Sequence, residues 1–180
     1  LGYLTTRNYD GYGNLAEQTE HARALMSGDN AAAPDPDDRT VRYTYDRNDR
    51  KISQTQVGVL YHDAATGSEG QRGDIVTTYG YDAVGNLTRS TDAYGASSYS
   101  FYDALGRVSA VLAPTRASTI NNQSLTPVTL LRRNAHGDVL VQTESARGAI
   151  NVSASGYTLA GSSADDRSTL TLYDSHGHAV

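Results

Sequence analysis

The sequence contains no cysteine and no tryptophan, and its 180 residues include only one phenylalanine and one methionine. The missing cysteine excludes disulfide bonds and thiolate metal sites. No apolar run approaches the ~20 residues that a membrane-spanning helix needs, and no signal peptide is visible. Hydrophobic residues make up 38% of the chain, below the roughly 45–50% usual for globular proteins. A single large core is therefore not expected.

Positive charge is also sparse. The 15 Lys and Arg are scattered singly among 20 Asp and Glu, and the net charge is −5. A nucleic-acid-binding face needs clustered basic residues. We therefore expect no nucleic-acid partner.

Tyrosine and glycine are abundant, with 13 and 17 copies. Tyrosine suits a half-buried sheet surface, because its ring packs while its hydroxyl reaches water or a hydrogen-bond partner. Many glycines indicate many turns. Together they favour a thin, extended β architecture.

The dipeptide Tyr-Asp recurs along the chain. Random order would produce about one copy, and there are five: Tyr9-Asp10, Tyr45-Asp46, Tyr81-Asp82, Tyr102-Asp103 and Tyr173-Asp174. Glycine follows three residues after the Asp in four of them: Gly13, Gly85, Gly106 and Gly177. The second copy has Asp49 there, and Asp tolerates a positive φ.

A sixth, less regular unit aligns at Asn134, with Gly137 three residues later. The motif is therefore Tyr-Asp-x-x-Gly, followed by a polar and then an apolar residue. Successive Asp (or Asn) positions are 36, 36, 21, 31 and 40 residues apart. The shortest spacing approximates the bare unit, and the others carry insertions.

Each unit is predicted to be a β-hairpin. Residues alternate before the Asp, as in Val41–Tyr45, and a strand resumes after the Gly, as in Leu87–Ser90. Asp can close an Asx turn, and Gly supplies the left-handed residue of a bulged hairpin loop. Two strands alone are marginally stable in water. We therefore expect an all-β fold of consecutive antiparallel hairpins, stacked edge to edge into a curved ribbon or spiral with long loops.

Tyr81-Asp-Ala-Val-Gly-Asn-Leu87 and Tyr102-Asp-Ala-Leu-Gly-Arg-Val108 resemble the RHS, or YD, repeat. That family includes bacterial polymorphic toxins, the C components of insecticidal toxin complexes, wall-associated bacterial proteins and teneurins. The resemblance implies a secreted or cell-surface protein whose repeats form a hollow shell, often around a C-terminal toxin. The family's self-cleaving core has no match here, so only structural roles are carried over.

We expect residues 1–180 to be a single YD-repeat segment of a larger protein, with units centred near 10, 46, 82, 103, 134 and 174. No catalytic residue, metal ligand or cofactor is assigned, and any ligand-binding residues are unknown. The predicted structural turn positions are Tyr9, Asp10, Gly13, Tyr45, Asp46, Tyr81, Asp82, Gly85, Tyr102, Asp103, Gly106, Asn134, Gly137, Tyr173, Asp174 and Gly177.

The stretches between units are predicted to be loops, where binding functions usually reside. They are Ser27–Asp38, Tyr61–Asp74, Ala113–Pro127 and Gly156–Arg167. One segment is ambiguous. Ala16–Met26 consists of good helix formers, whereas its position after the first turn favours a strand at least through Thr19.

Alternative chemistries are weakly indicated. His176 and His178 lack carboxylate or Cys partners at zinc-ligand spacing, and Asp35, Asp37 and Asp38 lack the pattern of a calcium loop. No nucleophile elbow or phosphate-binding loop is present. The repeated Asp residues could also form a carboxylate ladder for cations or sugars, although closing turns explains their placement without a ligand.

Three functions remain at this point. The first is a non-enzymatic scaffold that encloses or displays a toxin or other partner domain of its own chain. The second is an adhesin or surface filament that binds carbohydrate or neighbouring copies through exposed strand edges. The third, a hydrolase or metal enzyme, finds no set of acid, base and nucleophile in the sequence.

Overall fold

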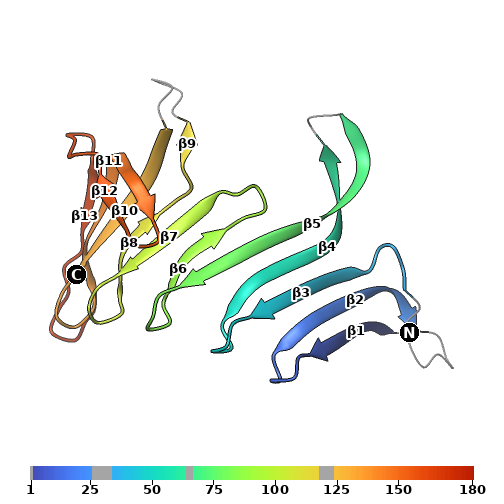
Figure 1. Cartoon of the computed structure of the whole chain (residues 1–180). Helices are drawn as coiled ribbons and strands as arrows, with labels where there is room; N and C mark the ends of the chain where they lie inside the picture. The colour runs from blue at the N-terminus through green and yellow to red at the C-terminus, as the bar shows by residue number, and fades with distance from the viewer. Residues whose placement is uncertain (1, 26–33, 64–66, 118–123) are drawn as a thin grey trace. The chain divides into compact units, whose positions relative to one another are not determined.

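The computed structural model describes residues 2–25, 34–63, 67–117 and 124–180. All regular secondary structure in these ranges is β-strand (Figure 1), which confirms the all-β prediction. The chain divides into two compact units, Leu1–Tyr79 and Gly80–Val180.

The first unit is a run of antiparallel strands in which each strand pairs with the next along the chain. Its strands are β1 (Gly2–Tyr9), β2 (Leu15–Leu25), β3 (Arg39–Tyr45), β4 (Lys51–Asp63) and β5 (Ser68–Tyr81), whose last two residues belong to the second unit.

The second unit continues the antiparallel pattern, in the order β6-β7-β8-β10-β11-β12, with β9 on β10 and β13 on β11. Its strands are β6 (Leu87–Thr91), β7 (Ser97–Tyr102), β8 (Val108–Leu112), β9 (Arg116–Ala117), β10 (Ser124–Arg133), β11 (Val139–Ser153), β12 (Gly156–Leu159) and β13 (Arg167–Leu170). Within each unit, the prediction of consecutive antiparallel hairpins paired edge to edge is confirmed.

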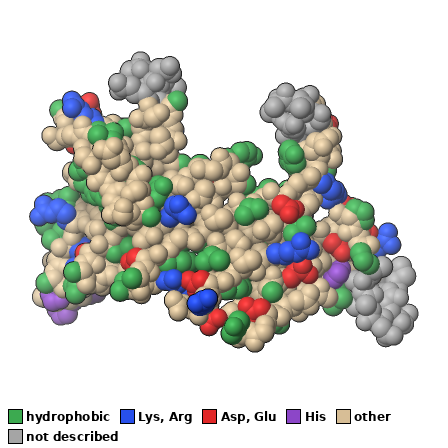
Figure 2. All heavy atoms as spheres, in the orientation of Figure 1, with side chains coloured by type: hydrophobic (Ala, Val, Ile, Leu, Met, Phe, Trp, Pro, Cys, Tyr) green, Lys and Arg blue, Asp and Glu red, His purple; other side chains and the backbone are tan. Residues whose placement is uncertain are grey.

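The hydrophobic core is small and lies in the second unit. Its buried residues are Ala110 and Leu112 of β8, Val128 of β10 and Ala149 of β11. Phe101 of β7 and Tyr157 of β12 pack against this core, with ring centroids 4.7 Å apart. On the face shown in Figure 2, hydrophobic side chains are dispersed among polar and charged ones. Both observations agree with the low hydrophobic content of the sequence.

Strand β11 has a bulge just before Ala149, the residue that it contributes to the core. The β10–β11 register shifts between Thr126 and Val128, and Gly148 on the bulged strand has a φ of +63°. A side chain at Gly148 would collide with the Thr126 carbonyl and the Leu125 side chain. Glycine is therefore required at this position for both conformation and space.

The helical alternative for Ala16–Met26 is wrong over the described residues. β2 runs through Leu25 and pairs with β1 on one side and β3 on the other, as in Thr6↔Thr19 and Thr19↔Thr40. Pairing on both sides overrides helix propensity, which is a weak preference. Met26 lies outside the described residues.

Three of the predicted loops are partly strand. The β4–β5 ladder extends through Tyr61↔Gln71 to Asp63↔Ser68, so most of Tyr61–Asp74 is hairpin. Within Gly156–Arg167, Gly156–Leu159 forms β12. Within Ala113–Pro127, β9 pairs with the start of β10. The glycines and serines of these three segments lie at bulges and hairpin turns, and composition alone does not distinguish such positions from loops. Parts of the predicted loops lie outside the described residues. These parts are residues 27–33 of Ser27–Asp38, residues 64–66 of Tyr61–Asp74 and residues 118–123 of Ala113–Pro127.

Candidate functional site

The Tyr-Asp positions form one recurrent turn. In each, we number the turn Asp (or Asn134) as position 0. At Asp82, the backbone N–H of Asp82 donates to the carbonyl of Asn86 at +4 (3.0 Å), and the N–H of Gly85 at +3 donates to the Asp82 carbonyl (3.2 Å). The carboxylate Oδ1 of Asp82 accepts the N–H groups of Val84 and Asn86. The same bonds recur at Asp10, Asp46, Asp103 and Asp174.

The residue at +3 has a positive φ in every one of these turns. The values run from 73° at Gly106 to 105° at Gly137, and Asp49 has 58°. A register shift just before the Asp, as between Thr44 and Tyr45, gives the hairpin its bulge. This is the geometry that a type I turn followed by a left-handed residue produces.

The second carboxylate oxygen binds the side chain at +4. Asp103 Oδ2 accepts from Arg107 Nε at 2.8 Å, and Asp82 Oδ2 accepts from Asn86 at 2.8 Å. His178 lies in the same position against Asp174 at 3.2 Å. In the sixth unit the roles are exchanged, because Asn134 donates to Asp138. The turn residues thus satisfy one another within the hairpin.

These contacts lower the pKa of the turn carboxylates. For Asp103, the backbone N–H of Arg107 contributes most, and the Arg107 guanidinium adds to it. For Asp82, desolvation raises the pKa, but the bonds from Asn86, Val84 and Gly85 outweigh it. The carboxylates are therefore ionised acceptors at neutral pH, directed at their own turn. No group of three His, Cys, Asp or Glu side chains placed to hold a metal ion occurs among the described residues.

A further turn of the same kind, at Asp92, was not identified from the sequence. The N–H groups of Tyr94 and Ala96 donate to Asp92 Oδ1, and Gly95 has a φ of +79°. Thr91 precedes it instead of Tyr, so a search for Tyr-Asp misses it. The pattern Asp-x-x-Gly alone would have found it. This turn connects β6 to β7, at the opposite end of those strands from the Tyr-Asp turns (Figure 1).

In three of the units, the tyrosine at −1 connects the hairpin to the one before it. The Tyr45 hydroxyl donates to the carbonyl of Leu15 (2.9 Å), which is the +5 residue of the preceding turn. Tyr102 binds the carbonyl of Leu87 (2.8 Å) and Tyr173 that of Val139 (3.3 Å) in the same way. Arg133 replaces the tyrosine in the sixth unit, and its Nε donates to the Val108 carbonyl at 3.2 Å. The hydrogen bond is thus preserved although the residue type changes.

The register between successive hairpins is constant. The residue at +7 of one hairpin lies opposite the residue at −4 of the next in five cases: Glu17↔Arg42, Ser53↔Thr78, Arg89↔Tyr99, Ala110↔Leu130 and Val141↔Leu170. The spacing between the turns varies from 21 to 40 residues over the same pairs. The turn, and not the length of the insertion, therefore determines how neighbouring hairpins align.

A second set of carboxylates was also missed. Asp38, Asp74 and Asp166 each lie at −8, and each accepts the backbone N–H of the +12 residue of the preceding hairpin. Those N–H groups belong to Ala22, Gly58 and Ala146, beside bulges at which the strand register shifts. A bulge leaves a backbone N–H without a hydrogen-bond partner in the neighbouring strand. The carboxylate of the −8 Asp accepts this N–H instead. At the sixth unit, Thr126 occupies the −8 position instead of Asp, and its hydroxyl hydrogen-bonds the hydroxyl of Thr115, the +12 residue of the preceding hairpin, at 2.7 Å.

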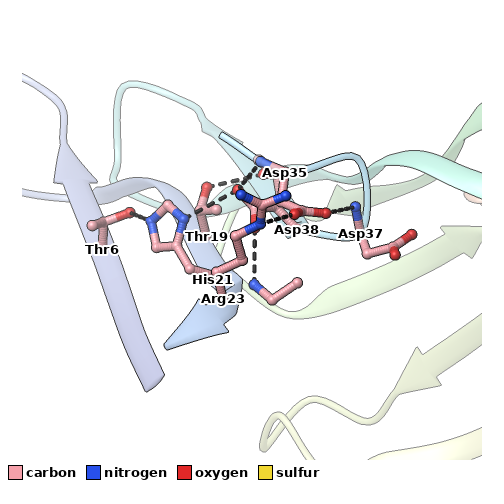
Figure 3. A network of polar contacts seen from close by, with 9 residues as sticks. Thr6, Thr19, His21, Arg23, Asp35, Asp37 and Asp38 are labelled. Carbon is pink, nitrogen blue, oxygen red and sulfur yellow. Dashed lines mark hydrogen bonds and ion pairs between the residues drawn. The ribbon is translucent and has the colours of Figure 1, made fainter. Parts of the chain in front are cut away.

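Asp38 also belongs to a polar network with His21 and Thr6 (Figure 3). His21 Nδ1 lies 3.1 Å from Asp38 Oδ2, and His21 Nε2 lies 3.2 Å from Thr6 Oγ1. The His21 and Asp38 side chains are only 11% and 12% exposed. The backbone N–H of Ala22 is the main cause of the lowered pKa of Asp38. The order hydroxyl, imidazole, carboxylate resembles that of a catalytic relay. Here the three side chains hold together β1, β2 and the segment before β3.

A shallow cavity of about 490 Å³ lies in the first unit, beside this network. Val41, Val57 and Leu60 form part of its apolar lining, and Arg39 and Arg72 contribute charge. Arg72 forms an ion pair with Asp37 at 3.2 Å.

The recurrent turns and the constant register define an all-β hairpin-repeat protein. Residues 81–118 match the RHS Repeat family. This match confirms the resemblance to the RHS/YD repeat that the Tyr-Asp motif indicates, and the chain contains an RHS repeat. A search of curated proteins finds no match.

Among solved structures, the chain is similar to part of TcdB2-TccC3-Cdc42 (18% identity, TM-score 0.42) and of TcdB2-TccC3-TEV (16% identity, TM-score 0.44). Each match covers 99% of this chain and 10% of the other. A Photorhabdus luminescens Tc holotoxin pore matches over 81% of this chain and 9% of the other, with 16% identity and a TM-score of 0.30. The chain thus spans about a tenth of the length of these proteins.

Proposed function

We propose that the chain is a non-enzymatic structural scaffold of a secreted or surface RHS/YD-repeat protein, and that its hairpins form a wall that encloses or displays a toxin or other partner domain. The observation that carries this proposal is the constant register between hairpins despite variable insertions. A constant register allows hairpins to be added one after another, as in repeat proteins whose units contact only their neighbours. The RHS repeat at residues 81–118 supports the same role.

The described polar groups of the turns also support a structural role. The Asp and Gly positions form hydrogen bonds within their hairpins, and Tyr45, Tyr102 and Tyr173 donate to the hairpin before them. We assign no catalytic residue, metal or cofactor to these positions. Partners are the remainder of the same larger chain or neighbouring copies. The secreted and surface members of the family that the repeats resemble support an extracellular location. Among the described residues, no helix is long and apolar enough to cross a membrane.

Limited proteolysis of the full-length gene product tests enclosure. We expect the partner domain to survive digestion in the unmodified protein and to be cut when both Gly85 and Gly106 are replaced by valine. Asp49 occupies the same turn position with a positive φ, so replacing the two glycines by aspartate is the matched control and should retain protection. A partner domain cut equally fast in all three proteins would contradict enclosure, and one exposed on an intact wall would leave only display.

A further inference from the structure

The basic residues of the chain are almost all arginines, and Lys51 is the only lysine in the sequence. It stands at +5 of the second turn. In the other units the +5 residue is apolar: Leu15, Leu87, Val108, Val139 and Ala179. Lys51 is half-buried, so its ammonium group needs partners that replace part of its hydration.

Two tyrosine rings and one amide are such partners. The Nζ atom of Lys51 lies 5.3 Å from the ring centroid of Tyr43 on β3 and 5.0 Å from that of Tyr79 on β5. It also donates a hydrogen bond to Oε1 of Gln54 on its own strand, β4, at 2.9 Å. A cation within about 6 Å of an aromatic ring centroid, over the ring face, is attracted by the ring. One ammonium group therefore connects three strands that lie side by side in the first unit (Figure 1).

This contact depends on the positive charge of Lys51. The ring faces attract a cation, and acetylation of a lysine removes both its charge and its cation–π contact. The contact is important in the first unit, because all the buried core residues of the described chain belong to the second unit. Side-chain contacts between neighbouring strands therefore contribute a larger share of the stability of the first unit.

We propose that Lys51 is an acylation site, and that its acylation releases the contact that connects β3, β4 and β5. The ammonium group loses a proton to water, and Nζ attacks the carbonyl carbon of an activated acyl donor, a thioester or an anhydride. The N–C bond forms, and the leaving group departs with the electron pair of the bond that breaks. The product is a neutral amide. This proposal is independent of what the scaffold encloses.

Acetic anhydride is the probe that tests the proposal on the whole chain. Treatment with hydroxylamine afterwards removes acetyl esters from tyrosines, and mass spectrometry locates the remaining acetyl groups. We expect Lys51 to carry one. Amide hydrogen exchange in β3, β4 and β5 should then be roughly threefold to tenfold faster, because two ring contacts are lost. The amides of β10 and β11 in the second unit should keep their rates.

Three matched comparisons separate the charge from other effects. Lys51→Arg keeps a positive charge and has no amine to acylate, so the same treatment should leave its exchange rates unchanged even though the α-amine of the chain reacts. Reductive methylation of Lys51 keeps the charge and should leave β3, β4 and β5 protected. Tyr79→Leu removes one of the two rings in advance, so acetylation should accelerate exchange less in this variant than in the unmodified chain.

Three results would overturn the proposal. If the α-amine is acetylated and Lys51 is not, the side chain is not accessible to an acyl donor. Equal acceleration after acetylation and after methylation would mean that the charge does not hold the strands together. An acceleration in treated Lys51→Arg as large as that in the treated unmodified chain would assign the effect to the α-amine.

Discussion

At the scale of single residues, the turn carboxylate has two separate tasks. One oxygen of Asp103 accepts backbone N–H groups and the other accepts the Arg107 side chain. Asn134 shows that an amide oxygen can perform the first task, since it accepts the N–H groups of Gly137 and Asp138. A neutral oxygen can therefore accept the backbone N–H groups, although the lowered pKa of Asp103 shows that the charge strengthens these bonds as well as the bond from Arg107. This division allows the two contributions to be measured separately.

The free energy of unfolding should fall in acid because of these carboxylates. The folded-state pKa of Asp46, Asp82, Asp103 and Asp174 lies below the ordinary value of 3.8. Their stabilisation is therefore complete above the unfolded-state pKa near 4 and is lost as the pH falls through the folded-state pKa. Asp103→Asn should be less stable than the unmodified chain at pH 7, and the difference should shrink below pH ~4.

Denaturant unfolding at pH 7, 4 and 3 measures this effect. Asp103→Ala is the matched comparison, because alanine removes the backbone bonds as well and should cost more than asparagine at every pH. If Asp103→Asn instead kept a constant deficit from pH 7 to pH 3, the charge would contribute nothing.

Gly106 is a second residue-scale test, because it has a φ of +73° and only ordinary contacts around it. A residue with a side chain is destabilised by roughly 1–2 kcal/mol in the left-handed region, and a β-branched residue fits worst. Gly106→Val should therefore lower the free energy of unfolding by about 2 kcal/mol. Gly106→Asp, which copies the residue type found at Asp49, should lower it by less. Thermal unfolding of the two variants distinguishes them, and equal melting temperatures would contradict the turn conformation.

At the scale of elements, the hairpins beside the Tyr-Asp turns were predictable, whereas the bulges within the strands were not. Alternating residues around Tyr-Asp and Gly are local signals, so the strands beside each turn follow from the sequence. Asp74 and Asp166 accept N–H groups of a neighbouring strand. Their role depends on how that strand aligns with its neighbour, and a local sequence pattern does not give this alignment. The extended β4–β5 hairpin was missed for a related reason, because Gly70 and Gly73 lie in a strand whose composition resembles that of a loop.

Gly148 tests the bulge in β11. Alanine there would combine left-handed strain with a collision against the Thr126 carbonyl. We expect Gly148→Ala to lower the free energy of unfolding by about 3 kcal/mol. Gly156→Ala is the control, because nothing lies within contact distance of an added methyl group at Gly156. Chemical denaturation of both variants measures the difference. A loss of stability at Gly156 as large as that at Gly148 would mean that the bulge is not the cause.

At the scale of the molecule, stability is distributed unevenly. The buried core lies within the second unit, with Leu112 at 0% exposure. The first unit relies on ladder hydrogen bonds and on polar braces such as that of His21 and Asp38. Each hairpin contacts its neighbours in the chain, and in such proteins stability is approximately a sum of local terms. A defect in one unit should therefore remain local.

Leu112→Ala tests this locality. Truncating a buried leucine costs about 2–5 kcal/mol, so the variant should unfold more easily in the second unit. Hydrogen exchange should accelerate in β7, β8 and β10, while the amides of β1 to β4 keep their rates. Val111→Ala is the control, because Val111 is 40% exposed on the same strand and should have a small effect. Uniform acceleration across the chain would show that the two units unfold together.

The antiparallel order of the hairpins has a mechanical consequence. The hydrogen bonds between antiparallel strands are perpendicular to the strands and follow one another along them. When one end of the chain is pulled away from its partner strand, these bonds therefore break one after another and not all at once. Each hairpin therefore peels away separately, and the 21 residues from Asp82 to Asp103 would release about 70 Å of thread. Under tension, a series of such hairpins can therefore be unfolded one hairpin at a time, and each tight turn can re-form without waiting for the others.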